Sequence, residues 1–471
     1  METECNATQL EFKGVGRRKV TAEFDGGRLS SDGGAVLLRE LDLSLGIMAR
    51  LARCFADGRD ESRVEHSVET LLRQRVFGIA LGYEDLNDHD ELMRDPLLAL
   101  SSGKGDVDGA SRRRAADVGK ALASSSTLNR MELASDQIDA AERYKKIAYD
   151  SKAIEALLVD VFLDSYDSPP EEIVLDFDAT DDPLHGDQEG KFFHGYYRCY
   201  CYMPLYVTCG DHVLVSKLRT SDRDGADGAL DELARITARI RERWPDTRII
   251  VRADSGFCRD AIMAWCERNG VYYVLGLAKN ARLHHRILWQ LHQARCLHKD
   301  SGRAARVFTE FRYRTLSSWT KSRRVIAKAE HLAKGSNPRF IVTNLPGHVW
   351  RSRELYEDLY CARGDMENRI KEQQLDLFAD RTSAGTMRAN QLRLWFSTFA
   401  YVLLSALRRI ALQGTCLANA TCGTLRLKLL KIGARIKTSV RRFMIHLASA
   451  CPYQDIFRQA LSRIHAYPLR V

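Results

Sequence analysis

The stretch IVLDFDATDDPLHGDQEGKFFHG, residues 173–195, decides the fold. It begins as a short apolar run rich in β-branched residues, which predicts a strand, and it carries aspartates at and just beyond the strand's end. Alternation along a strand puts Asp176 and Asp178 on one face and their apolar neighbours on the other. Two carboxylates on one face repel unless one is protonated or a cation lies between them, and hard oxygen ligands favour Mg²⁺ or Mn²⁺. The stretch therefore predicts either a metal site or an Asp-rich turn.

A second predicted strand also ends in an aspartate. It is TRIIVRA, residues 247–253, and Asp254 follows it directly. Across residues 166–280 the pattern predicts three strands, a helix at 229–243, a strand, a helix and a strand. That order is typical of an α/β fold with a mixed sheet flanked by helices.

The amino-terminal region, residues 1–165, has a mainly helical pattern. Amphipathic stretches lie at 35–41 and 64–81. A basic cluster within 109–135 fits either a helix-turn-helix or a loop with a charged collar. We expect this region to bind DNA.

The remaining regions follow the sheet segment. Alternating stretches at 281–349 predict a β insertion, and residues 350–412 return to the sheet domain through helices at 352–374 and 392–410. Residues 413–471 predict a basic helical tail.

The composition is that of an ordinary globular protein. With 471 residues, 45% hydrophobic and 28% charged, the chain suffices for two or three domains. It contains no run of about 18 apolar residues and no basic-then-apolar leader pattern. Its twelve cysteines lack the spacing of a zinc site or a disulfide framework. We therefore expect a cytoplasmic protein without a membrane partner.

Positive charge is concentrated at the carboxy-terminal end. From residue 401 onward, twelve Lys and Arg residues and one acid, Asp455, give a charge of +11, whereas the whole chain carries +9. Such a segment is typical of nucleic-acid binding, because a solvated face usually mixes signs. The candidate DNA-binding residues here are Arg426, Lys428, Arg435, Lys437, Arg441 and Arg442.

The helix expected at 352–374 carries a further group of polar side chains. Tyr360, Arg363 and Glu367 lie along one helical face, at spacings of three and four residues. Without further context, Arg363 and Glu367 could equally form an ordinary surface ion pair that contributes a few tenths of a kcal/mol.

Three separated motifs together resemble the DDE transposases of bacterial insertion sequences. They are Asp178-Ala179-Thr180, Arg252-Ala253-Asp254-Ser255-Gly256, and Tyr360-x-x-Arg363-x-x-x-Glu367. The sequence around these motifs is similar to that of the group named for insertion sequence thirteen-eighty, in the segments LDFDATDDPLHGDQEG, RADSGF and RGDMENRIKEQQ. The resemblance covers about residues 170–400, with the motifs in the right order on the right types of element.

The resemblance implies an RNase H-like fold with a β insertion before the helix that bears the third acid. It assigns Asp178, Asp254 and Glu367 as the catalytic, metal-binding acids, and Tyr360 and Arg363 as the tyrosine and arginine of the helix signature. The signature commonly ends in a lysine where this chain has Gln374, so that DNA-backbone contact passes to Lys371 or is absent.

Two alternative ligands stay open. Asp176 shares a strand face with Asp178, and Glu372 lies five residues beyond Glu367.

The resemblance also implies an activity and partners. Two Mg²⁺ or Mn²⁺ ions would serve cleavage at the element's terminal inverted repeats and strand transfer of the 3′-hydroxyl into target DNA. Double-stranded DNA, both element ends and target, would be the partner, with a homodimer in the DNA complex, in the nucleoid-associated bacterial cytoplasm. The alternatives are an RNase H-like nuclease that does not join DNA and a non-catalytic DNA-binding derivative of a transposase.

Overall fold

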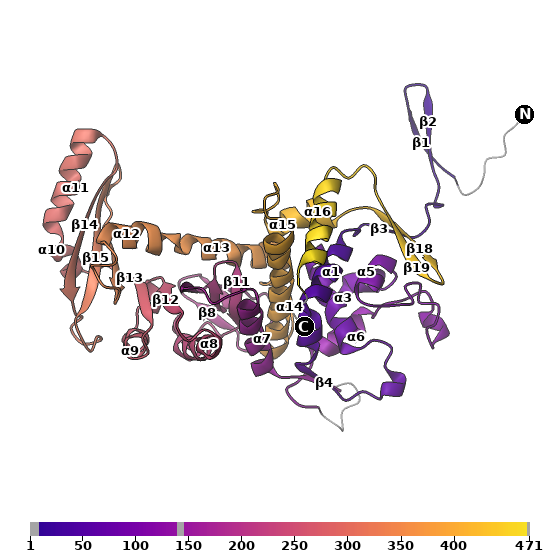
Figure 1. Ribbon diagram of the computed structural model, residues 1–471, viewed down its shortest axis with the longest axis horizontal. Coiled ribbons are helices and arrows are strands. Elements are labelled where there is room, and N and C mark those ends of the chain that lie inside the picture. The colour runs from indigo at the N-terminus through magenta and orange to yellow at the C-terminus, as the bar shows by residue number, and fades with distance from the viewer. Residues whose placement is uncertain (1–8, 139–145, 469–471) are drawn as a thin grey trace, which may run out of the picture.

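The computed structural model describes residues 9–138 and 146–468, which form a sheet region and a helical region along one long axis (Figure 1). Helix α14 (Met387–Ala406) stands between the two regions. Most of its residues are buried, as its apolar sequence predicts, because helix α3 (Val68–Leu81) packs on one side and the sheet on the other. No described helix is both long and apolar enough to cross a membrane.

The central sheet is mixed, as predicted. Its first five strands lie in the order β11 (His212–Lys217), β10 (Leu205–Cys209), β6 (Glu172–Ala179), β12 (Arg248–Ala253) and β13 (Tyr272–Leu277). Strand β10 runs antiparallel to both β11 and β6, whereas β12 runs parallel to β6 and β13 parallel to β12. The carboxyl ends of β6 and β12 therefore meet at the same edge of the sheet.

Helices α7 (Ser151–Asp164), α8 (Ala229–Arg243) and α9 (Asp260–Arg268) cover one face of these strands. Ile173, Leu175 and Phe177 of β6 point into that core. The opposite face carries Val174, Asp176 and Asp178, so the alternation predicted for this strand is correct.

The β insertion predicted at residues 281–349 is not a separate unit, because it contains helices and its strands join the central sheet. The segment begins with helices α10 (Ala281–Arg286) and α11 (Leu288–Ser301). Strands β14 (Ala305–Tyr313), β15 (Arg323–Leu332), β16 (Gly335–Ser336) and β17 (Arg339–Thr343) follow. Because β17 pairs with β13 and β15 pairs with β17, these strands extend the central sheet to nine.

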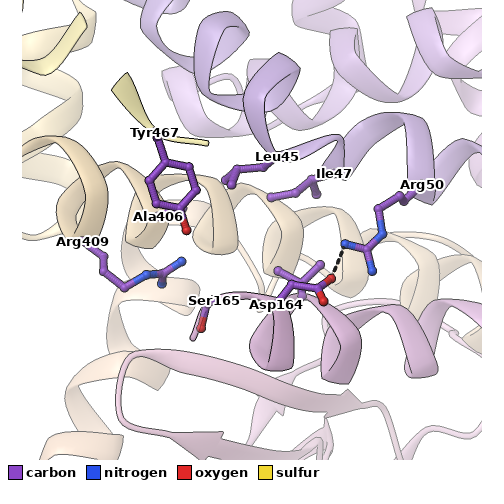
Figure 2. A pocket seen from close by; sticks show the side chains of 9 residues that line it. Leu45, Ile47, Arg50, Asp164, Ser165, Ala406, Arg409 and Tyr467 are labelled. Carbon is purple, nitrogen blue, oxygen red and sulfur yellow. Dashed lines mark hydrogen bonds and ion pairs between the residues drawn. The ribbon is translucent and has the colours of Figure 1, made fainter. Parts of the chain in front are cut away.

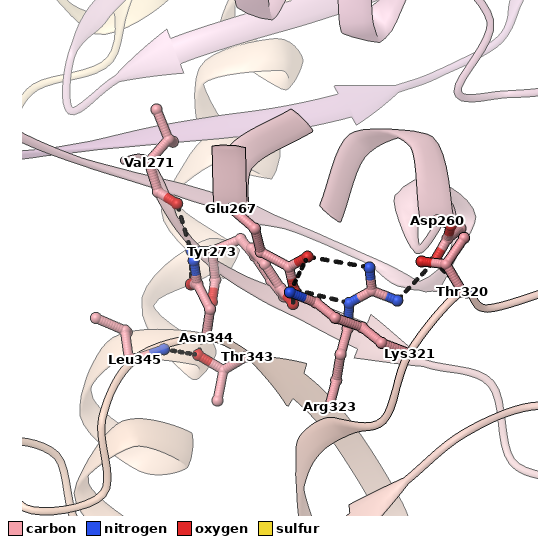
Figure 3. A network of polar contacts seen from close by, with 10 residues as sticks. All are labelled: Asp260, Glu267, Val271, Tyr273, Thr320, Lys321, Arg323, Thr343, Asn344 and Leu345. Atoms are coloured by element: carbon pink, nitrogen blue, oxygen red, sulfur yellow. Dashed lines mark hydrogen bonds and ion pairs between the residues drawn. The ribbon is translucent and has the colours of Figure 1, made fainter. Parts of the chain in front are cut away.

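A buried ionic network fastens this extension to the rest of the sheet (Figure 3). Arg323 on β15 is 2% exposed and donates to Glu267 and Asp260 of α9, at 2.8 and 2.6 Å. Glu267 also accepts a hydrogen bond from the Tyr273 hydroxyl on β13, at 2.9 Å. One guanidinium thus links β15 to the helix that covers β13.

We expect Arg323→Ala to destabilise the protein by about 3–5 kcal/mol, because it leaves Glu267 and Asp260 without their buried partner. Thermal or urea unfolding measures the effect. Lys321→Ala is the matched control: Lys321 also pairs with Glu267, at 3.0 Å, but is 58% exposed, so its loss should cost less than about 1 kcal/mol. Equal effects of the two substitutions would contradict this role of Arg323.

The amino-terminal region is mainly helical, as predicted. Besides α3 it contains α1 (Ala35–Leu45), α2 (Ile47–Ala52), α4 (His89–Leu92), α5 (Pro96–Ser101) and α6 (Ser125–Glu132). Its short strands are β1 (Leu10–Val15), β2 (Arg18–Ala22), β3 (Leu29–Ser30), β4 (Phe55–Asp57) and β5 (Ile147–Tyr149).

The prediction of a helix-turn-helix within residues 109–135 is wrong. Only α6 and a single 3₁₀ turn, Ala115–Asp117, form there. Gly109 and Gly119 adopt positive φ angles that interrupt a helix. Arg112, from the basic cluster, pairs with Glu65 at 2.6 Å. The charged-collar alternative describes this segment better.

The carboxy-terminal segment is only partly helical, which corrects the predicted helical tail. Helices α15 (Cys422–Leu425) and α16 (Gln454–Ala466) flank a hairpin of β18 (Ala434–Ser439) and β19 (Arg442–Leu447). Ile436, Phe443 and Ile445 pack against the helical core from this hairpin. Their alternation with basic residues fits a strand with one face covered, and β18 also pairs with β3.

A small pocket marks where the helical and sheet regions meet (Figure 2). Leu45 and Ile47 line it from the amino-terminal helices, and Asp164 and Ser165 line it from the end of α7. Arg50 of α2 donates to Asp164 at 2.8 Å along one side. The pocket belongs to the packing that fixes α7 against α2.

Candidate active site

Asp178 and Asp254 lie side by side at the edge of the central sheet. Asp178 is near the end of β6, and Asp254 comes directly after β12. Phe177 is in register with Ala253, so the next residues along these two parallel strands are the two aspartates. Two buried carboxylates so close together repel each other unless a cation or a proton balances their charges.

A segmented helical run crosses this edge and carries the third predicted acid. It comprises α12 (Ser352–Glu354), a π-helical segment Leu355–Tyr360, a 3₁₀ turn Cys361–Arg363, α13 (Gly364–Lys371) and a second π-helical segment Glu372–Asp376. The sequence predicted one continuous helix here. The departures from α-helical geometry surround the signature residues, where π-bulges often mark function.

A buried arginine fastens this helical run to the sheet. Arg252 of β12 forms a two-pronged contact with Asp176 of β6, at 2.5 and 2.7 Å, and donates to the Leu359 carbonyl oxygen at 2.6 Å. Asp176 is buried, which raises its pKa against the lowering effect of Arg252. Both donors that Asp176 meets come from one guanidinium, so its carboxylate serves to position the helix.

Arg363 brings two of the three predicted acids together. Its guanidinium lies 3.3 Å from the Asp178 carboxylate and 2.9 Å from that of Glu367. The pKa of Asp178 is raised to about 6, chiefly by burial and also by the charges of Asp254 and Glu367, against the lowering effect of Arg363. The three acids therefore share one electrostatic site, which carries more negative charge than Arg363 balances.

The donor chemistry of this site fits a hard divalent cation. Asp178, Asp254 and Glu367 offer carboxylate oxygens, the ligands that Mg²⁺ and Mn²⁺ favour. Within residues 9–138 and 146–468, no group of three or more His, Cys, Asp and Glu side chains has the spacing of a metal site. In this conformation Arg363 supplies the positive charge between Asp178 and Glu367.

A pocket opens on the Asp254 side of the acids. Asp254, Lys279, Arg339, Tyr356 and Tyr360 are among its lining residues. Two cations and two aromatic rings beside a carboxylate suit a phosphate backbone with its bases. Sequence patterns did not single out Lys279, Arg339 or Tyr356, because they come from the segment after β13, from β17 and from the π-helical segment.

Gly276 leaves room for the Tyr360 side chain beside this pocket. A Cβ atom on Gly276 of β13 would lie 2.6 Å from the Tyr360 hydroxyl oxygen and 2.8 Å from the Ser255 nitrogen. The pKa of Tyr360 is raised by burial and by the charge of Asp254, and lowered by Arg363. An isolated glycine within a predicted strand was the one sequence signal of this close approach.

The alternative acid Glu372 is committed to structural contacts. Its carboxylate accepts from Arg369 at 3.0 Å, from Arg408 at 2.8 Å and from the Cys422 backbone nitrogen at 3.0 Å. It is buried, and it joins the helical run to α15 and to the π-helical segment Leu407–Ala411 that follows α14.

Gln374, at the place of the signature lysine, faces inward. It donates to Asp182 at 2.9 Å and to the Asp181 carbonyl oxygen at 3.2 Å. Burial raises the pKa of Asp182 to about 8. Lys371, the candidate for the lysine's DNA contact, is exposed on α13.

The basic residues of the carboxy-terminal segment separate into two kinds. Lys428, Arg435, Lys437, Arg441 and Arg442 are exposed. Arg426 instead donates to the Ala80 carbonyl oxygen at 3.0 Å and lies over the Phe378 ring, so it holds the segment against α3.

Comparison with known proteins identifies the family. The family described as transposase DDE domain group 1 matches residues 12–469. No curated protein sequence matches this chain. Among solved structures, the chain matches the piggyBac transposase in a cryo-EM structure of its synaptic complex with hairpin DNA, with a TM-score of 0.41 and 12% sequence identity over 84% of this chain and 79% of that one. Since the family match spans nearly the whole sequence, the chain belongs to the transposase DDE domain group 1 family.

Proposed function

We propose that this transposase belongs to an insertion sequence, cuts DNA at the element's terminal inverted repeats and transfers the freed 3′-hydroxyl into target DNA. The observation that carries the proposal is the meeting of Asp178 and Glu367 on Arg363, with Asp254 on the neighbouring parallel strand. The group named for insertion sequence thirteen-eighty, with its Tyr-Arg-Glu helix signature, is the proposed subgroup.

An RNase H-like catalytic domain is part of this proposal. Its support is the strand order β11-β10-β6-β12-β13, in which three antiparallel strands are followed by two parallel ones. The proposed acids then lie at the ends of β6 and β12, which are the first and fourth of these five strands in chain order, and on the later helix α13.

In the proposed site the carboxylates of Asp178, Asp254 and Glu367 would hold two Mg²⁺ or Mn²⁺ ions. Such ions, when bound, activate the attacking oxygen and stabilise the leaving oxygen. Arg363 releases the acids and binds a DNA phosphate through two parallel N–H groups. Asp176 and Glu372, each in a buried ion pair, keep the sheet and helix in place instead of binding metal.

DNA binding draws on the positive charge outside the acidic site. We assign the exposed Lys428, Arg435, Lys437, Arg441 and Arg442 to the phosphate backbone, with Tyr360 and Lys371 nearer the cleaved bond. We also propose that a homodimer pairs the two element ends. The protein would act in the bacterial cytoplasm, in association with the nucleoid.

The test is incubation of the protein with a labelled duplex that carries the element's end, in Mg²⁺ and in EDTA. We expect metal-dependent cuts at the end, followed by joined products. Cuts without joining would replace the proposal by a nuclease, and specific binding without cuts would replace it by a DNA-binding derivative.

Metal binding should depend on pH because a proton competes for Asp178. Its pKa of about 6 leaves the carboxyl protonated below that pH. We expect the affinity for Mn²⁺, measured by calorimetry without DNA, to be constant above about pH 7 and to fall about tenfold per unit below pH 6. Asp178→Asn should bind weakly throughout. A constant wild-type affinity from pH 5 to 7 would contradict the role of Asp178.

A further inference from the structure

The hairpin of β1 and β2 projects from the helical region into solvent (Figure 1). Every residue of both strands is exposed. A two-stranded hairpin without packing on one face is marginally stable in water. Its exposed state therefore calls for a partner.

The hairpin has an apolar face. Leu10 lies opposite Ala22, and Phe12 lies opposite Val20, so these four side chains share one side of the ribbon. Leu10, Phe12 and Val20 are 45, 56 and 37% exposed.

The tip of the hairpin is basic and has a defined shape. Lys13, Arg17, Arg18 and Lys19 are exposed, residues 12–22 contain no acid, and no described residue forms an ion pair with these four. The register shifts between Phe12 and Val15, where a Cβ atom on Gly14 would lie 2.6 Å from the Arg18 carbonyl oxygen. The bulge thus requires glycine and fixes where the cations lie.

A second basic ribbon begins at the base of the first. Strand β3, which follows the β1–β2 hairpin along the chain, pairs with β18 of the β18–β19 hairpin. At the junction, Gly27 has a φ of +78°, and a Cβ atom there would lie 3.3 Å from an Arg435 guanidinium nitrogen. The two ribbons come from opposite ends of the chain, and both lie at the helical end of the molecule (Figure 1).

We propose that the β1–β2 hairpin is a DNA-binding arm that enters a groove of the duplex held by β18–β19. This inference rests on the proposed function, because it takes the element end as the partner. The major groove admits a two-stranded β-ribbon, and apolar side chains there contact thymine methyl groups. Arg17, Arg18 and Lys19 bind the flanking phosphates, while Phe12 and Val20 face the bases.

The test compares two triple variants in equilibrium binding to an end duplex over a range of salt concentrations. Arg17→Ala/Arg18→Ala/Lys19→Ala removes the tip charge, and Arg295→Ala/Lys299→Ala/Arg303→Ala removes three exposed cations in and beside α11, at the far end of the molecule. We expect the tip variant to reduce the slope of log affinity against log salt by about 2 to 3, since each phosphate contact contributes about 0.9. The control should keep the wild-type slope, and both should keep the wild-type melting temperature.

Equal slopes for the wild type and the tip variant would overturn the inference. So would an effect of Phe12→Ser/Val20→Ser on the monomer–dimer equilibrium alone, with DNA binding unchanged, because the apolar face would then dock on a second copy. Wild-type protein is assayed for metal-dependent end cleavage in parallel. Cleavage with equal slopes refutes the arm only, whereas wild type that neither binds nor cuts refutes the proposed function.

Discussion

Asp178→Asn is expected to lower the rate of DNA cleavage by about 10³-fold or more and, at the same time, to stabilise the DNA-free protein. The loss follows because metal ions supply several kcal/mol of charge stabilisation, and each 1.36 kcal/mol is a factor of ten. Binding to the element end should persist, because asparagine keeps the shape of the side chain. Cleavage at the wild-type rate would remove Asp178 from the site.

The stability gain follows from linkage. The folded-state pKa of Asp178 is about 6, above the ordinary 3.8, so the folded protein loses stability as pH rises from about 4 to 6. Above that range the penalty is about 3 kcal/mol at most, at 1.36 kcal/mol per pKa unit. Asparagine carries no charge and escapes the penalty. Urea unfolding at pH 7.5 without metal measures the difference.

Asp176→Asn is the matched control on the same strand face. Burial raises the pKa of Asp176 as well, but this substitution also leaves the buried Arg252 guanidinium without a counter-charge. That larger cost should destabilise the protein by about 3–5 kcal/mol. Two aspartates that are two residues apart are thus expected to have opposite effects on unfolding. The same sign for both would contradict the division between a positioning acid and a metal-binding acid.

Arg363→Ala is expected to tighten Mn²⁺ binding to the DNA-free protein by about tenfold while it reduces DNA cleavage. The guanidinium competes with a cation for Asp178 and Glu367, and a competing interaction of about 1.4 kcal/mol amounts to one factor of ten. Cleavage falls because the phosphate loses its two-pronged contact. Calorimetry at pH 8, where Asp178 is ionised, isolates this competition.

Two substitutions control for charge and position. Arg363→Lys keeps the charge and should leave Mn²⁺ affinity closer to the wild type. Arg369→Ala, six residues along the same helical run, removes a cation that pairs with Asp211 and Glu372 and should leave Mn²⁺ affinity unchanged. Equal Mn²⁺ affinities for wild type and Arg363→Ala would show that the Arg363 guanidinium does not compete with the metal ion for Asp178 and Glu367.

Local patterns predicted much of the sheet region. Helix α8 has the predicted bounds, since its apolar residues recur with helical period and Trp244-Pro245 ends it. The ends of β6 and β12 were predicted within a residue or two, because apolar β-branched runs stop at aspartates. The roles of Asp178, Asp254 and Glu367 stay predictions.

Long-range contacts account for what the sequence did not show. Strand β17 reads as an isolated short strand until β13 offers it a free edge, so the extended sheet could not be predicted locally. The β18–β19 hairpin depends on pairing with β3, about 400 residues earlier in the chain. Arg252 reads as part of a motif, and only the fold shows that it fastens the helical run to Asp176.

The most direct test of the central claim is a crystal structure of the protein bound to its element end and Mn²⁺, with anomalous scattering to locate the ions. We expect Mn²⁺ peaks within ligand distance of the Asp178, Asp254 and Glu367 carboxylates, with Arg363 moved onto a DNA phosphate. Peaks at other acids in a complex that cuts DNA, or a cutting complex with Arg363 still bridging Asp178 and Glu367, would contradict the account.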